Sequence, residues 1–230
     1  MIEQLIEEII LFIAGFGSGI FVGIASGTAA SIVIPTLTVL AGYTIYQSIG
    51  TSLFVDCIIG AVAGIVFLKK GNVELKPTLI LVVTGVIGAL IGSLFTSGVP
   101  EMGLNILIGA MLLFLGINFI INGVQKNIDY IEEKLSFDFI KKNRTPTFVI
   151  IGLFVGFLSG FIGMGSSGTF AIILIFILGY NLHTAIGTSL VMMSFIAGFG
   201  ATGHLMNDEV VLPSLVIIGT AAAIGAFIGS

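Results

Sequence analysis

Long apolar stretches, separated by short polar breaks, run along almost the whole chain of 230 residues. A helix needs about 20 mostly apolar residues to cross the hydrocarbon core of a bilayer. Several of the stretches reach that length, so the pattern predicts an all-α, polytopic membrane protein. The predicted segments are Ile6–Ala25, Thr28–Ala41, Ile45–Leu68, Thr78–Thr96, Gly103–Ile121, Phe148–Ile162, Ser167–Leu178, Leu182–Leu205 and Leu212–Gly229.

The first half of the chain recurs in the second half at a fixed offset. Ile49-Gly50-Thr51-Ser52-Leu53 returns letter for letter as Ile186-Gly187-Thr188-Ser189-Leu190, 137 positions later. The same offset carries Gly42-Tyr43 onto Gly179-Tyr180. Matches at one fixed spacing indicate a duplicated unit, which is an architecture typical of membrane transporters.

The duplication divides the chain into three parts. We expect a first transmembrane repeat over residues 1–122, an amphipathic linker over 123–146 and a second transmembrane repeat over 147–230. The second repeat has no counterpart of Gly103–Ile121, so its last helix is missing. We expect one further helix of about 20 residues beyond Ser230, with a degenerate second copy as the alternative.

Basic residues set the expected orientation of the two repeats. Lys69, Lys70 and Lys76 lie between the third and fourth segments, and the other five basic residues lie in or beside the linker. Cytoplasmic loops are rich in lysine and arginine, so both groups are expected in the cytoplasm. The loop equivalent to the first group, Asn207-Asp208-Glu209, has no basic residue and is expected outside. The pattern therefore predicts inverted-topology repeats, with the N-terminus outside and the central linker cytoplasmic.

The linker carries its own apolar pattern. Ile128, Ile131, Leu135 and Phe139 recur at helical spacing among charged residues. This pattern predicts an amphipathic helix lying in the membrane interface. A solvated tether is the alternative.

The second segment of each repeat is too short to cross a membrane. Thr28–Ala41 and Ser167–Leu178 would be roughly 20 Å long at about 1.5 Å per residue, against a hydrocarbon core of about 30 Å. We expect short broken or re-entrant helices, and whether they span stays open. The long third segments begin at capping residues, which are Thr44 with Gln47 in the first repeat and Asn181 in the second.

Composition narrows the function. Hydrophobic residues make up 57% of the chain, charged residues 9%, and the mean hydropathy is +1.21. A soluble domain carries about 25% charged residues, so the chain is expected in the lipid bilayer. The net charge of -4 argues against a nucleic-acid partner. No nucleophile constellation, paired carboxylates or metal-ligand spacing appears, so we expect no enzyme and no metal site.

The joints between the first two segments of each repeat carry the candidate substrate site. Glycine-rich, broken backbone survives in lipid only where it is buried or lines a cavity, and short broken segments in two inverted halves indicate a binding site. Free N–H groups at a helix start favour an anion, and nearby hydroxyls add donors. Close helix packing alone is the alternative. The candidate substrate-binding residues are Ser26, Gly27, Thr28, Ser31, Thr51, Ser52, Gly163, Gly165, Ser166, Ser167, Gly168, Thr188 and Ser189.

Asp56 is the acidic residue that lies well inside an apolar segment. A carboxylate within the membrane is a functional hypothesis by default, so Asp56 is the candidate site for a coupling proton or Na⁺. A neutral, hydrogen-bonded structural acid is the equal alternative. Its counterpart in the second repeat is Met193. Gly163-x-Gly165-x-x-Gly168 matches a dinucleotide fingerprint but lacks a βαβ unit, so no cofactor is expected.

Two motifs resemble those of the TauE/SafE family of sulfite and organosulfur-anion exporters. One is the glycine-rich joint, followed in the first repeat by Ile34-Pro35-Thr36-Leu37. The other stands as Ser48–Leu53 and Ala185–Leu190. The resemblance implies transport of small sulfur-containing anions, coupled to an ion gradient. The first joint, Ser26–Ser31, lacks the glycine cluster usual in the family, which bears on the substrate.

These observations together predict a multi-pass transporter of the cell membrane. We expect a secondary transporter, an exporter, that moves small anions such as sulfite, sulfonates or carboxylates by alternating access. A passive anion channel and a non-transporting membrane scaffold subunit are the alternatives. The expected partners are a small anion and the lipid bilayer, and the oligomeric state stays open, with a homodimer among the options.

Overall fold

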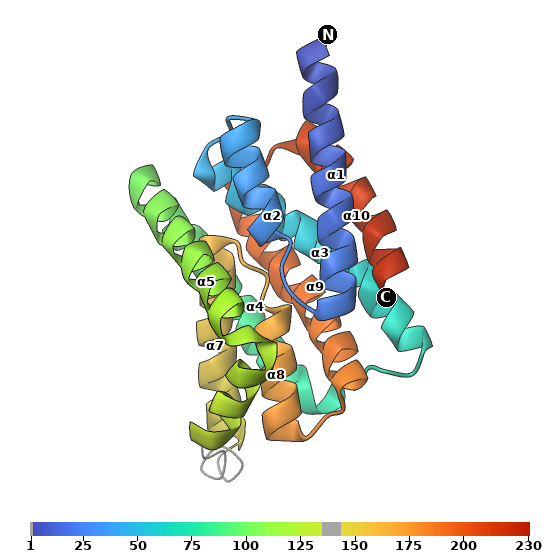
Figure 1. Ribbon diagram of the computed structural model, residues 1–230. Coiled ribbons are helices and arrows are strands. Elements are labelled where there is room, and N and C mark those ends of the chain that lie inside the picture. Colours follow the sequence, from blue (N-terminus) through green and yellow to red (C-terminus); the bar gives the residue numbers. More distant parts are fainter. Residues whose placement is uncertain (1, 135–143) are drawn as a thin grey trace.

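Figure 1 shows the computed structural model, which describes residues 2–134 and 144–230. All regular secondary structure in these ranges is helical. Within the described residues, nine helices match the nine apolar segments: α1 (Ile2–Ala25), α2 (Ala30–Pro35), α3 (Ile45–Lys69), α4 (Leu79–Thr96), α5 (Glu101–Lys134), α7 (Arg144–Ile162), α8 (Ser167–Leu178), α9 (Leu182–Met206) and α10 (Leu212–Gly229). A π-helical stretch, Thr36–Leu40, extends α2, and a 3₁₀ turn, Lys76–Thr78, precedes α4.

Six of these helices are long and apolar enough to cross a membrane, namely α1, α3, α4, α7, α9 and α10. Large apolar side chains such as Ile13, Phe154 and Phe227 are exposed on them. A soluble protein rarely exposes so much contiguous apolar surface, whereas in a bilayer that surface faces lipid. The all-α, polytopic membrane fold predicted from the sequence is confirmed.

The first two helices of each repeat form a hairpin. In Figure 1 α1 descends from the N-terminus and α2 turns back beside it. The turn needs a residue in the left-handed region, which is Ser26 (φ 53°) in the first repeat and the equivalent Gly163 (φ 73°) in the second. The helices α2, with its π extension, and α8 are short, as predicted. Their shortness follows from the hairpin, because each begins at the joint inside the protein.

The first helix of each repeat packs against the fourth helix of the other repeat. A Cβ atom on Gly19 of α1 would lie 2.2 Å from the carbonyl oxygen of Ala222 in α10. At the equivalent place, a Cβ atom on Gly156 of α7 would lie 2.1 Å from the carbonyl oxygen of Gly85 in α4. Small residues let helix backbones approach closely in membranes. The same close contact is therefore made twice, and each time it joins one repeat to the other.

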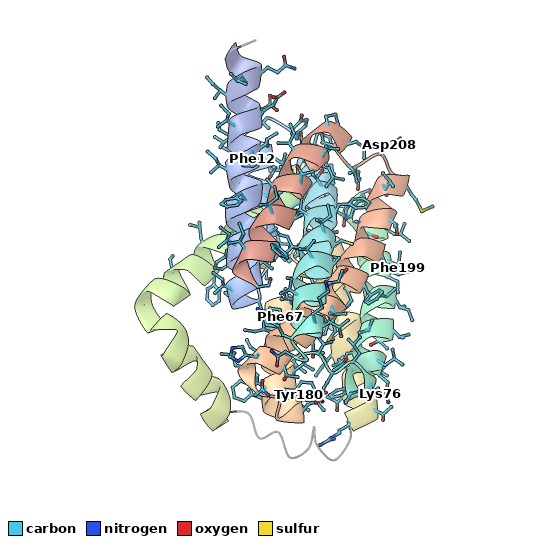
Figure 2. All side chains as sticks on the ribbon, turned by 90° about the vertical axis from the view of Figure 1, so that its right-hand side faces the viewer. Phe12, Phe67, Lys76, Tyr180, Phe199 and Asp208 are labelled. Carbon is cyan, nitrogen blue, oxygen red and sulfur yellow. The ribbon has the colours of Figure 1, made fainter. Side chains whose placement is uncertain are left out.

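The helices α3 and α9 cross at the centre of the molecule. Gly60 of α3 lies against Leu190 and Ser194, while Leu53, nearer the start of α3, lies against Gly200, so the two helices run antiparallel. The loop that contains Lys76 and the equivalent loop of the second repeat, which contains Asp208, lie at opposite ends of the molecule (Figure 2). These contacts relate the two repeats to one another, whereas their orientation in the membrane stays a prediction.

The helix α5 continues past the expected division between the first repeat and the linker. It runs without a break from Glu101 to Lys134, through the expected division at residues 122 and 123. No proline interrupts this stretch, so nothing stops the helix where its apolar part ends. The predicted linker stripe therefore begins inside α5, and its members Leu135 and Phe139 lie outside the described residues.

Close packing at Gly19 predicts a clear difference between two substitutions on α1. Gly19→Ala drives a methyl group into the backbone of α10, so we expect the midpoint of thermal unfolding in detergent to fall, at an overpacking cost of about 1–3 kcal/mol. Gly17 is the matched control, because a Cβ atom there meets nothing within 4 Å. Gly17→Ala should leave the midpoint unchanged or raise it. Equal effects of the two variants would contradict the packing described.

Candidate functional site

The two joints meet at the side chain of Asp56, in the middle of α3. The residue is 0% exposed. Its Oδ1 accepts a hydrogen bond from the backbone N–H of Ala29 at 2.7 Å. Its Oδ2 accepts from the Thr28 hydroxyl at 2.7 Å and from the Gly165 N–H at 3.0 Å. A single carboxylate thus receives donors from the broken backbone of both repeats.

The hydroxyl of Thr28 links the same groups. While it donates to Asp56, its Oγ1 also lies 2.9 Å from the Gly165 nitrogen and 3.1 Å from the Ala30 nitrogen, and so accepts from both. Thr28 and Gly165 are 137 positions apart, so they are equivalent residues of the two repeats. Equivalent residues can touch only near the axis that relates the repeats. The Asp56 carboxylate therefore lies close to that axis.

No cation faces this carboxylate among the residues that the structure describes, where the single ion pair is His204 with Glu209. The carboxylate is held instead by N–H and O–H dipoles. Hydrogen bonds of this kind, to a charged acceptor, are the strong ones, and Ala29 precedes the first residue of α2, where backbone N–H groups are free. The arrangement is that of an anion site whose anion is part of the protein.

A second set of hydroxyls closes the joints. Ser26 Oγ lies 2.9 Å from Ser189 Oγ, and Ser52 Oγ donates to the carbonyl of Gly163 at 3.1 Å. These two contacts are equivalent under the offset of 137. Ser167 Oγ also donates to the carbonyl of Gly27. Predicted site residues from both repeats therefore lie together at the joints.

The two threonines of the repeated pentapeptide lie elsewhere. Thr51 Oγ1 accepts from the Val211 N–H at 3.0 Å, and Thr188 Oγ1 accepts from the Glu74 N–H at 2.9 Å. Both contacts fasten a loop of the opposite repeat to the start of α3 or α9. Near Glu74, burial raises the pKa of Tyr180 to about 12, and Glu74 adds to the rise. The structure places Thr51 and Thr188 at these loops, away from the joints.

The remaining predicted residues border the joints. Ser31 Oγ donates to the carbonyl of Thr28, and a Cβ atom on Gly168 would lie 2.9 Å from the carbonyl oxygen of Ser26. Ser166, just before α8, is 5% exposed, and within residues 2–134 and 144–230 its hydroxyl has no hydrogen-bond partner. A buried hydroxyl without a partner costs about 1–3 kcal/mol. Ser166 therefore offers an unused donor beside the joint.

The hollows described for this chain lie away from the joints. One of about 340 Å³ lies between α3 and α10. Its lining residues are Val62, Ile65, Val66, Lys69, Lys70 and Phe227. At the joints the groups pack directly against one another, since a Cβ atom on Gly165 would lie 2.2 Å from Asp56 Oδ2. The structure thus describes a conformation closed at its centre.

Comparison with known proteins gives the family. The chain matches the family described as Sulfite exporter TauE/SafE over residues 11–230. It belongs to this family. It is 27% identical over 223 residues to "Probable membrane transporter protein YdhB" of Bacillus subtilis (strain 168), covering 96% of this chain and 88% of the relative. It is 25% identical over 224 residues to "Probable membrane transporter protein ORF9" of Sinorhizobium sp, covering 96% and 80%.

No solved structure matches the chain. The TauE/SafE match and the names of both relatives support a multi-pass membrane transporter. Among the described residues, no group of three or more His, Cys, Asp or Glu side chains is placed to hold a metal ion. The joints of this TauE/SafE chain direct hydrogen-bond donors at the carboxylate of Asp56.

A second buried polar cluster was not predicted from the sequence. His204 Nδ1 lies 2.7 Å from Glu209 Oε2, and His204 Nε2 lies 2.9 Å from the carbonyl oxygen of Gly160. Ser97 Oγ donates to Glu209 Oε1 at 2.8 Å. Because a carbonyl oxygen only accepts, Nε2 is the donor in the hydrogen bond to Gly160. Glu209 is therefore the side-chain partner of His204.

The capping predictions are confirmed. Thr44 and Gln47 form a capping box at the start of α3. Asn181 caps α9 by accepting from the Thr184 N–H at 2.9 Å.

The central role of Thr28 can be tested in the TauE/SafE chain by removing its hydroxyl. Thr28→Val keeps the shape of the side chain but removes the hydroxyl that donates to Asp56. The same hydroxyl is also lost as an acceptor for the N–H groups of Ala30 and Gly165. We expect a loss of stability of about 2–3 kcal/mol, measured as the thermal unfolding midpoint in detergent. Thr28→Ser should restore most of the loss. Thr220→Val is the matched control, because the Thr220 hydroxyl is bonded only within α10. Similar losses for Thr28→Val and Thr220→Val would rule out a special role for Thr28.

Proposed function

We propose that this protein is a secondary transporter of small anions, such as sulfite, sulfonates or carboxylates, and that it works by alternating access around the two joints. The observation that carries the proposal is the meeting of two broken helices at one buried carboxylate. Donors from Thr28, Ala29 and Gly165 already surround a pair of anionic oxygens there. A transported oxyanion needs donors of the same kind. Export as the direction rests on the description of the family.

The proposed architecture is a pair of inverted repeats separated by a cytoplasmic linker. The antiparallel course of α3 and α9 supports it, because these two helices are equivalent under the duplication. Opposite ends for the Lys76 and Asp208 loops add support (Figure 2). With the lysine-rich loop in the cytoplasm, the N-terminus lies outside the cell membrane. Alternating access is then a rocking of one repeat against the other.

Asp56 is the proposed coupling site. It is fully buried, faces no cation among the described residues and touches both joints. A movement that separates the joints would break some of the hydrogen bonds to this carboxylate, because its donors come from both joints. Binding a proton or Na⁺ there would change the charge at the centre of the transport path.

Transport assays on the purified full chain in proteoliposomes test the proposal. We expect saturable uptake of at least one anion from a panel of sulfite, methanesulfonate and acetate. Gly165→Leu should abolish it, because the side chain would fill the space of the Asp56 carboxylate. Gly17→Leu is the control, since Gly17 is exposed and borders open space, and it should retain uptake.

The alternatives give different results in the same assay. Flux that rises linearly with anion concentration and ignores gradients would indicate a channel. A complete absence of flux for every anion, with a correctly folded protein, would overturn the proposal and favour a scaffold subunit.

A further inference from the structure

We propose that the carboxylate of Asp56 is a built-in competitor of the transported anion, so that each anion binds only together with one proton on Asp56. This inference rests on the proposed function and specifies its coupling. It states that the protein's own anion occupies the substrate's donors in the closed conformation, and that neutralising this anion releases them.

The first step is the identity of the donors. Asp56 accepts from one N–H group of each joint, those of Ala29 and Gly165, and from the hydroxyl of Thr28. The joints are the places where this fold leaves backbone N–H groups without helical partners. A carboxylate, sulfonate or sulfite presents oxygens of similar size and charge to those of Asp56. The two anions would therefore use the same hydrogens.

The second step is charge. Two like charges at hydrogen-bond range in a buried site oppose each other strongly, and an opposite charge is the usual remedy. No lysine, arginine or histidine nitrogen lies within ion-pair distance of Asp56 in the parts of the chain that the structure describes. A second anion can therefore enter only if Asp56 loses its charge. Protonation achieves this, because the carboxylate takes up one H⁺ and becomes a neutral carboxyl group.

The third step distinguishes a proton from Na⁺. Metal cations such as Na⁺ are held by oxygen atoms. The atoms that face the Asp56 oxygens are instead hydrogen donors: two N–H groups and one O–H group. The one oxygen among them, Thr28 Oγ1, already accepts from Gly165 and Ala30. The site is built to surround negative charge, and it does not supply the ligands of a cation.

The surroundings contain few other titratable groups. On α3 the next residue is Cys57, a thiol that interacts electrostatically with Asp56. From α9 the sulfur of Met193 approaches the same space beside Gly165. The joints contribute Thr28, Ala29 and Gly165, none of which titrates in the accessible range. Asp56 is therefore the group whose charge changes as pH is varied.

The second repeat has no competitor of its own. Met193 stands where a second Asp56 would be, and the buried hydroxyl of Ser166, beside the start of α8, has no hydrogen-bond partner among the residues that the structure describes. This unused donor lies next to Gly165, whose N–H is already directed at an anion. An oxyanion that replaces the Asp56 carboxylate would thus find one further donor. The anion and the proton on Asp56 share the centre, and both leave when the site opens on the other side, so that Asp56 is a carboxylate again.

The result is symport of one proton with one monoanion. The proton enters from the side where the anion binds, travels on Asp56 and is released with the anion, so charge balances. An inward proton gradient therefore drives uptake, and outward transport needs a sufficient outward gradient of the anion.

Equilibrium binding of methanesulfonate to the detergent-solubilised full chain tests the inference, because its charge is constant between about pH 5 and about pH 8. For the wild type we expect the Kd to rise by about tenfold per pH unit once Asp56 is ionised. We also expect about one proton to be taken up per anion bound, measured as a pH change in weakly buffered solution.

Asp56→Asn should bind methanesulfonate with a Kd that does not change with pH. In proteoliposomes it should exchange the anion across the membrane but lose accumulation driven by a proton gradient. Asp208→Asn is the matched control, because Asp208 is exposed in the α9–α10 loop, and it should behave as the wild type.

Failure of the inference and failure of the proposed function are distinguishable. If the wild type transports an anion saturably but takes up no proton and shows no pH dependence, the competitor role is wrong and the transporter remains. Stimulation by Na⁺ without proton uptake would also overturn the competitor role and leave the transporter in place. If the wild type neither binds nor transports any anion of the panel, both proposals fall. The proton-uptake measurement uses the wild type alone, so it can contradict the inference even if Asp56→Asn folds poorly.

Discussion

The structure depends on one constraint: backbone N–H groups freed inside a membrane protein must find acceptors. Helices satisfy almost all of these groups within themselves, which is why helices are the rule in lipid. This chain breaks two helices at its centre, at Ser26–Ala29 and at Gly163–Ser166. The carboxylate of Asp56 accepts from one N–H of each break. The Asp56 side chain thus supplies an acceptor to an N–H group of each break and links the two breaks to each other.

Close packing around that centre comes from glycines placed against the opposite repeat. The contacts of Gly19 with α10 and of Gly156 with α4 are the same contact made twice. Neither repeat buries these surfaces alone, so the two halves are stable only in combination. The loop contacts of Thr51 and Thr188 follow the same exchange between repeats.

Much of this fold could be predicted from the sequence, because hydropathy, capping and repetition are local or periodic signals. The bounds of α3 and α9 follow from Thr44 and Asn181, which cap helices by hydrogen bonds to residues three positions away. These signals do not give the orientation of the chain in the membrane, which was predicted from the basic residues in its loops. The end of α5 was not predictable from apolar content, since a helix continues into polar sequence unless something breaks it.

The candidate site was predictable as a set of residues but not as a set of contacts. The glycine-rich joints and Asp56 stood out, yet nothing in the spacing showed that Asp56 would accept from Ala29 and Gly165, 27 and 109 positions away. The pairing of His204 with Glu209 was missed for a similar reason, because a separation of five positions across the end of α9 has no helical regularity. Long-range pairing is a property of the packed structure.

The contact between Thr28 and Gly165 has an evolutionary consequence. If the repeat arose from a half-size chain that paired with a second copy of itself, both members of this contact were once the same residue. The positions of Asp56 and Met193 were then identical as well, and both side chains approach the space beside Gly165. Two acids there would have crowded one set of donors. Fusion of the two copies into one chain allowed a single acid to remain, and so permitted a charge asymmetry that a self-paired ancestor could not encode.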